Sequence, residues 1–178
     1  MKKIFTILGL VSATTIMFAQ TNLVQNPGFE SDLTSWAAGT GSGYTAPAIL
    51  TTNPHSGLKL AAYELPSATT GFYQNVAIAG STQYTLTFWY KASTARPEGT
   101  TQNNIFRLWS VMKDTTGTPV YNSATANDDP LRSNNGYLPI APTAWTQHTV
   151  VFTSHPSAAS IDVAFRSYGS GSSYVDDV

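Results

Sequence analysis

Two carboxylates at opposite ends of the chain have the residue type and the setting of a metal site. Glu30 closes the segment Asn-Leu-Val-Gln-Asn-Pro-Gly-Phe-Glu, and Asp176 lies in the terminal Tyr-Val-Asp-Asp-Val, each beside a short expected strand. If the fold brings its first and last strands together, the two acids repel unless a cation or a proton lies between them. The chain has no Cys and three His, so oxygen ligands and therefore calcium are favoured. The alternative is that both are ordinary surface acids.

A second set of residues could recognise a ligand. In three expected strands, aromatic or basic side chains alternate with the apolar core positions and should point away from the core. The set consists of Trp89, Lys91, Arg107, Trp109 and Arg166. If the three strands share one sheet, its outer face carries a cleft in which arginine forks could bind paired hydroxyls or the carboxylates of anionic sugars. The alternative is an internal cation–π brace that the long loops cover.

No grouping of residues indicates catalysis. His55, His148 and His155 are far apart in the sequence, and His148 is in phase with core positions, which is typical of a structural histidine. The chain has no Gly-x-Ser-x-Gly elbow, no His-Glu-x-x-His motif and no phosphate-binding loop. We therefore expect that this domain is not an enzyme and that any catalysis resides in a downstream domain.

The elements that must position these residues are strands. Apolar residues alternate after residue 20, and clusters of Gly, Pro, Asn or Ser interrupt them about every 8 to 15 residues, which predicts an all-β antiparallel sandwich or jelly roll. Alternation is clearest at 83–91, where Leu86, Phe88 and Tyr90 share one phase. The other expected strands are 58–64, 73–78, 105–112, 146–153, 160–167 and 174–178.

Two polar stretches, 94–104 and 114–138, interrupt this rhythm. Loops of this length in a compact domain are usually functional or disordered. They are either loops that serve a site or solvated insertions.

Residues 1–19 have the pattern of a signal peptide. Lys2 and Lys3 precede an apolar run at 4–18 that is short for a membrane span, and cleavage is expected after Ala19. The alternatives are an uncleaved anchor or a buried helix. Removal of the signal leaves seven basic against ten acidic residues, a net charge of about −3 that argues against a nucleic-acid partner. We expect a secreted or cell-surface protein with no membrane partner.

Six segments occur in the order seen in one family of binding modules. They are 22–30, Trp36, 55–57 (His-Ser-Gly), 80–92, 144–153 and 174–178. In this order they resemble cenC-like carbohydrate-binding modules, the galactose-binding-like jelly rolls of families four, nine and twenty-two, and also modules that precede sorting domains in proteins exported by Bacteroidetes. The resemblance implies one β-sandwich domain at 20–178. Because the chain stops on its last strand, we expect the sequence to be truncated at its C-terminus.

The resemblance also implies a structural Ca²⁺ between Glu30 and Asp176, with backbone carbonyls near Gly28 and at 56–59 as further ligands. Asp177 alternates to the other side of its strand and is not expected to bind the ion. The implied function is a non-catalytic module that binds a polysaccharide or glycan and anchors an attached domain, as a monomer within a multidomain protein. The alternative is a calcium-stabilised structural or protein-interaction module with no glycan ligand.

Overall fold

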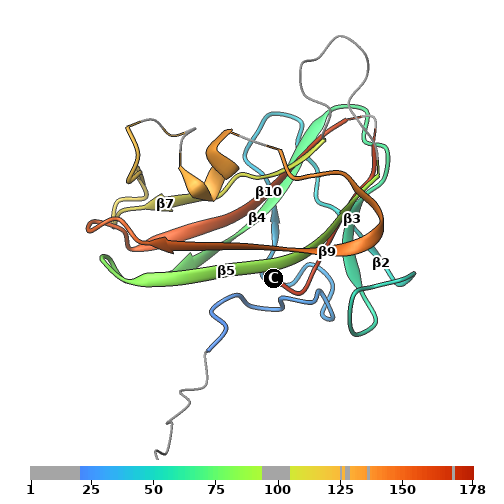
Figure 1. Cartoon of the computed structure of the whole chain (residues 1–178), viewed down its shortest axis with the longest axis horizontal. Helices are drawn as coiled ribbons and strands as arrows, with labels where there is room; N and C mark the ends of the chain where they lie inside the picture. Colours follow the sequence, from blue (N-terminus) through green and yellow to red (C-terminus); the bar gives the residue numbers. More distant parts are fainter. Residues whose placement is uncertain (1–20, 94–104, 125, 127–128, 136, 170) are drawn as a thin grey trace, which may run out of the picture.

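Strands and the loops between them make up nearly all of the computed structural model, which describes residues 21–93, 105–124, 126, 129–135, 137–169 and 171–178. The expected signal peptide and the polar stretch 94–104 lie outside the described residues. The strands form two antiparallel sheets packed face to face (Figure 1), so the predicted all-β jelly-roll sandwich is confirmed.

Each sheet combines strands from distant parts of the chain. The six-stranded sheet has the order β1 (Ala37–Ala38), β4 (Thr69–Ala77), β10 (Ser160–Tyr168), β7 (Val111–Lys113) and β8 (Pro119–Val120), with β6 (Phe106–Leu108) also paired to β10. The five-stranded sheet has the order β2 (Ala48–Leu50), β3 (Leu60–Tyr63), β11 (Ser173–Asp176), β5 (Gln83–Ala92) and β9 (Ala141–Thr153).

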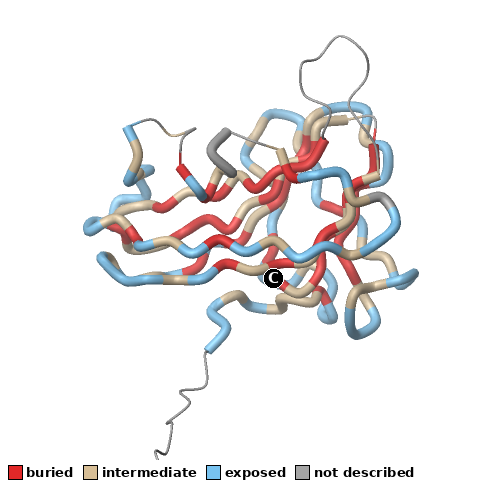
Figure 2. The backbone as a smooth tube through the Cα atoms, viewed as in Figure 1, coloured by how far each residue is buried: buried red, intermediate tan, exposed pale blue. Residues whose placement is uncertain are grey.

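The alternation in β5 follows the prediction. Leu86, Phe88 and Tyr90 are buried, whereas Trp89 and Lys91 are partly exposed on the outer face. Every second residue therefore faces the other sheet, as the period of a strand requires. Figure 2 shows buried segments along the strands of both sheets, whereas exposed residues lie in the loops and along parts of β5 and β9.

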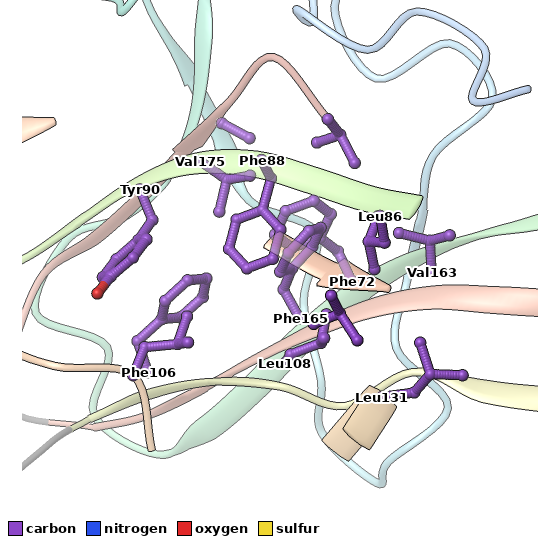
Figure 3. Packing of buried hydrophobic residues seen from close by; sticks show 14 of the residues in the cluster. Phe72, Leu86, Phe88, Tyr90, Phe106, Leu108, Leu131, Val163, Phe165 and Val175 are labelled. Carbon is purple, nitrogen blue, oxygen red and sulfur yellow. The ribbon is translucent and has the colours of Figure 1, made fainter. Parts of the chain in front are cut away.

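Aromatic rings fill the space between the sheets. Phe165 of β10 lies 4.8 Å from Phe88 of β5 and 5.2 Å from Phe72 of β4, measured between ring centres (Figure 3). Trp36 is 7 % exposed and lies 5.4 Å from Phe72. Such pairs add about 0.5–1.5 kcal/mol each to the free energy of burying the rings.

The expected strand at 105–112 is broken into β6 and β7. Trp109 still donates its backbone N–H to the Ala164 carbonyl, at 2.7 Å. The backbone N–H of Ser110 instead donates to the carbonyl of Leu131, at 2.9 Å, in the short 3-10 helix η2 (Pro130–Asn135). The Ser110 hydroxyl accepts the backbone N–H of Ala164. The break therefore places Trp109 beside η2.

The polar stretch 114–138 is partly structured. It contains β8 and η2, and Leu131 and Leu138 within it are buried in the core. The described part of this stretch is therefore packed onto the sandwich and is not a solvated insertion. Within the part of the chain that the structure describes, no helix has the length and apolarity needed to cross a membrane.

The two ends of the described chain meet. Val178 donates its backbone N–H to the Pro27 carbonyl at 3.1 Å, and the Asn22 amide donates to the Val178 carbonyl at 3.0 Å. The C-terminus accordingly lies beside the N-terminal segment in Figure 1. The bond between Asn22 and Val178 joins residues 156 positions apart. It brings the acids at 176 and 177 close to the N-terminal segment.

Candidate functional site

Asp176, the last residue of β11, is fully buried at the meeting point of the two chain ends. Its Oδ2 accepts the backbone N–H of His55 at 2.8 Å and of Ser56 at 3.3 Å, and its Oδ1 accepts that of Asp177 at 2.9 Å. No salt bridge joins it to a described cation. Burial, supported by the Asp177 charge, raises the pKa of this carboxyl to about 6, although the N–H bonds oppose the rise. A cation beside Asp176 would favour its ionised form.

Glu30 reaches the same turn from the other end of the chain. Its Oε1 accepts the backbone N–H of Leu58 at 2.8 Å and of Lys59 at 3.0 Å. The approach depends on Gly57, which has a φ of +61° and where a Cβ would overlap Glu30 Oε1. The structure thus brings Glu30 and Asp176 to one turn, 54–59, as the sequence predicts; an ion between them remains a prediction. We call Glu30, Asp176, Asp177 and this turn the end junction.

Asp177 also points into the end junction, contrary to the expectation from strand alternation. Strand β11 ends at Asp176, and a φ of +47° turns Asp177 back toward residues 55 and 56. Its Oδ2 lies 2.6 Å from His55 Nδ1, and its Oδ1 accepts the Ser56 hydroxyl at 2.8 Å. Alternation fails here because the residue lies beyond the last paired position of the strand.

The end junction offers oxygen donors of the kind that calcium prefers, but too few side chains to surround the ion by themselves. Its donors are carboxylate oxygens that converge near Gly28, where a Cβ would lie 3.3 Å from Asp177 Oδ1 and 3.7 Å from Asp176 Oδ1. Among the described residues, however, no three His, Cys, Asp or Glu side chains are spaced to hold a metal ion. A Ca²⁺ ion here would therefore take backbone carbonyls as several of its six to eight ligands.

Trp89 and Lys91 lie on the outer face of the five-stranded sheet, where they support the end junction. The His55 ring stacks on Trp89 with 3.9 Å between ring centres and 16° between planes. Lys91 Nζ lies 4.4 Å from the centre of the Trp145 ring. Lys91 Nζ donates to the Asn53 carbonyl at 3.5 Å, and Trp145 Nε1 donates to the same carbonyl at 3.2 Å. These contacts hold the turn 54–59 against β5 and β9.

The five predicted ligand residues do not share one face. Trp89 and Lys91 belong to β5 in the five-stranded sheet. The other three belong to the six-stranded sheet: Arg107 is in β6, Trp109 directly follows β6, and Arg166 is in β10. The two groups therefore face opposite sides of the sandwich. Local alternation separates these side chains from the core positions, although Arg107 is buried beneath its neighbours, but it carries no information about which sheet a strand joins.

On the six-stranded sheet, Trp109 is surrounded by guanidinium groups. The Cζ atoms of Arg166, Arg107 and Arg132 lie 4.1, 4.2 and 4.4 Å from its ring centre. Such distances correspond to cation–π contacts. Because an indole has only two faces, three guanidiniums leave little of the ring for stacking against a sugar. The predicted brace is therefore present, and it holds the arginines in fixed positions.

A cleft of about 220 Å³ lies next to this cluster, on the outer face of the six-stranded sheet. Its lining includes Tyr44, Tyr73, Trp109, Lys113, Arg132 and Arg166. The Arg166 Cζ lies 5.5 Å from the Tyr44 ring. The cleft thus combines partly exposed aromatic rings with positively charged hydrogen-bond donors.

Sequence reasoning missed Arg132 and Tyr44. Arg132 lies in η2, within the polar stretch 114–138 where no periodicity indicates a direction for any side chain. Tyr44 follows the glycine-rich run 39–43 and packs so closely over Gly41 that a Cβ there would overlap its ring. An aromatic residue directly after such a run is a signal that could have identified Tyr44.

A larger cavity, of about 670 Å³, opens between the sheets near the chain ends. Its lining is mostly apolar and includes Leu23, Ile78, Tyr84, Phe152 and Val178. Polar side chains, among them Asn22, Gln83 and Thr85, also line it, but its described lining contains none of the predicted ligand residues and no basic side chain. We therefore assign the candidate ligand site to the smaller cleft.

Comparison with known proteins defines the fold. No protein-family model and no curated protein matches the chain. Among solved structures, the enzymatically active domain of tailspike protein 4 from bacteriophage CBA120 matches with a TM-score of 0.65 and 16 % identity, over 88 % of this chain and 20 % of the tailspike chain. This chain therefore spans about a fifth of the length of that solved tailspike chain.

Two carbohydrate-binding modules match along nearly their whole length. A family 16 module gives a TM-score of 0.57 and 22 % identity over 87 % of this chain and 96 % of the module. The module TmCBM61, solved in complex with beta-1,4-galactotriose, gives a TM-score of 0.51 and 14 % identity over 89 % of this chain and 96 % of the module. The chain thus has the jelly-roll fold of carbohydrate-binding modules. The likeness to cenC-like modules and to Bacteroidetes proteins remains a prediction.

Proposed function

We propose that this domain is a non-catalytic carbohydrate-binding module of a secreted protein, and that the cleft on the six-stranded sheet holds the glycan. The observation that carries the proposal is the cleft itself, which Tyr44 and Tyr73 line together with Arg132 and Arg166, and in which the Arg166 guanidinium lies 5.5 Å from the Tyr44 ring. Sugars bind where flat apolar surfaces meet a few well-placed polar groups. Since guanidiniums cover Trp109, the two tyrosines provide the surface for the sugar rings.

The single acidic residue in the described lining of the cleft supports a non-catalytic role. Asp162 is the one acidic residue among the described lining residues, and its carboxylate is held by Lys113 at 2.5 Å and by the Asn75 amide at 2.7 Å. Glycoside hydrolysis ordinarily needs two carboxylates that flank the scissile bond. A single carboxylate in a salt bridge cannot provide both roles, so the cleft is suited to binding.

Such a module anchors an attached domain to polysaccharide. Binding by a single shallow cleft is weak, but tethering raises the local concentration of the attached domain at the polysaccharide surface. Export through the expected signal peptide would bring the protein to this substrate. Mass spectrometry of the exported protein should find Gln20 at its N-terminus.

We also propose that a Ca²⁺ ion stabilises the end junction. It is supported by three carboxylates, those of Glu30, Asp176 and Asp177, around one turn, and by the buried Asp176 that lacks a salt bridge to any described cation. Glu30 and Asp176 are the side-chain ligands of this proposal. The ion would act structurally, because the end junction and the cleft belong to different sheets.

A glycan array with the purified chain tests the proposed function. The wild type should retain at least one glycan, Tyr44→Ala should lose this retention, and Tyr174→Ala should keep it. Tyr174 is a matched control because it is a partly exposed tyrosine on β11, in the other sheet. Retention that survives Tyr44→Ala would place the site elsewhere.

The second candidate is a structural or protein-interaction module with no glycan ligand. The guanidiniums around Trp109 favour it, because they give this tryptophan a role within the fold. No retention of any plant, algal or microbial glycan would support this candidate. In Trp109→Ala, unchanged glycan retention together with a lower melting temperature would identify a purely structural brace.

A further inference from the structure

The cleft on the six-stranded sheet carries an excess of positive charge that the rest of the chain does not share. The whole chain has nine basic and ten acidic residues, so it has no general basic character. In the cleft, the Lys113 charge is balanced by Asp162. Arg132 and Arg166 form no salt bridge with a described carboxylate. Two guanidinium charges therefore face the cleft, and no carboxylate of the described residues forms a salt bridge with either.

These charges are held close together and partly out of water. Both guanidiniums lie within 4.4 Å of the Trp109 ring centre. Burial, together with the neighbouring charges of Arg166 and Arg107, lowers the pKa of Arg132, although Tyr121 and Asp129 oppose this effect. The three guanidiniums gathered around one ring repel one another, and an anion placed between the arginines would relieve this repulsion.

We propose that the cleft selects glycans that carry carboxylate or sulfate groups, with Arg132 and Arg166 binding the anion and Tyr44 contacting the adjoining sugar ring. The inference rests on the proposed function and names the ligand class for the same cleft. A guanidinium donates two parallel N–H bonds, which match the two oxygens of a carboxylate or sulfate. Cation–π contacts with Trp109 hold the forks in place, so little side-chain entropy is lost on binding.

The same geometry explains why a neutral sugar would bind less well. A neutral ligand would cover the guanidiniums without supplying charge, so they would lose contact with water and keep their mutual repulsion. The ring face that would otherwise favour a neutral sugar, that of Trp109, is occupied by the arginines. Discrimination between anionic and neutral ligands is therefore the expected property of this cleft.

Calorimetry with three matched ligands tests the inference on the wild-type chain. The ligands are a polyuronate, the same polysaccharide after chemical reduction of its carboxyl groups, and a sulfated glycan. We expect the polyuronate, the sulfated glycan or both to bind at least about ten-fold more tightly than the reduced polymer, as charge-assisted hydrogen bonds imply. Raising the ionic strength from about 0.05 to about 0.5 M should weaken only the anionic ligands. Preference for one anion identifies the charged group.

Two variants place the effect in the cleft. Arg166→Gln and Arg132→Gln should each reduce the preference for the anionic ligand about ten-fold. Lys59→Gln, which removes a partly buried cation paired with Asp32 on the other sheet's side, should not change it. Melting temperatures identify any variant that does not fold. The comparison of the three ligands on the wild-type chain does not depend on the variants. Equal affinity for the anionic and reduced polymers would overturn the inference and leave glycan binding intact. No affinity for any of the three, together with an empty glycan array, would overturn both.

Discussion

The buried carboxylate of Asp176 lies 2.8 Å from the backbone nitrogen of His55, a residue 121 positions earlier in the chain. This single contact ties β11 to the turn that also binds Glu30. Because Asp176 is the last residue of β11, the bond closes the sandwich at the point where the two ends of the described chain meet. Asp176 is therefore expected to matter for stability far more than an exposed acid does.

Replacing Asp176 with Asn should lower the free energy of unfolding by about 1–3 kcal/mol, because one of its two acceptor oxygens becomes a donor that faces backbone N–H groups. Asp32→Asn is the matched control. Asp32 is 70 % exposed in its side chain and pairs with Lys59 at the surface, so its loss should cost less than about 1 kcal/mol. Denaturant unfolding of both variants measures the difference. Equal losses would show that the Asp176 bonds do not hold the end junction together.

Gly57→Ala should destabilise the domain more than Gly117→Ala does. Both glycines have a positive φ, +61° and +82°, so both substitutions carry backbone strain of about 1 kcal/mol. At Gly57 the new Cβ also overlaps Glu30, whereas nothing lies within 4 Å of it at Gly117. The overlap should add about 1–3 kcal/mol, and paired thermal melts would detect it. Identical melting temperatures would mean that Glu30 does not sit on the turn.

Calcium should raise the melting temperature of the domain, and excess chelator should lower it. An ion that binds only the folded state stabilises that state by mass action, by about 2.7 kcal/mol at a concentration of one hundred times the dissociation constant. Glu30→Gln should remove most of the response, because it removes one proposed carboxylate ligand. Differential scanning calorimetry with and without chelator makes the measurement. A melting temperature that is insensitive to both would eliminate the ion, and the N–H bonds alone would then hold the acids.

His148 should destabilise the domain in mild acid, while Asp176, whose pKa burial raises to about 6, contributes in the opposite direction. Burial lowers the pKa of this histidine, whose ring lies 5.3 Å from that of Phe88, so the folded state favours the neutral form. The unfolded chain takes up the proton near pH 6.5, and it therefore binds more protons than the folded state as the pH falls through that value. The stabilisation is present above about pH 6.5 and is lost below it. His148→Phe should show a smaller fall in melting temperature between pH 7.5 and 5.5 than the wild type; an unchanged fall would assign the effect to other groups.

The sequence predicts the strands because alternation is local information, whereas the meeting of Glu30 and Asp176 is long-range and was expected only from the resemblance of the end motifs to a known family. Alternation around Phe88 identifies β5 and the direction of its side chains, and the short motifs around Glu30 and Asp176 identify the ends that meet. The assignment of strands to sheets depends on long-range pairing, so Trp89 and Arg107 were predicted to share a face and do not. The brace around Trp109 also depends on Arg132, which comes from an irregular segment without periodicity.

The indole N–H resonances of the tryptophans can locate the bound glycan in a single titration. Trp109 lines the cleft on the six-stranded sheet, whereas Trp89 and Trp145 lie on the outer face of the other sheet. A titration of the isotope-labelled chain with the glycan that the array retains best should move the Trp109 resonance and leave those of Trp89 and Trp145 in place. Movement of Trp89 or Trp145 without Trp109, or no movement at saturating glycan, would contradict binding in the cleft.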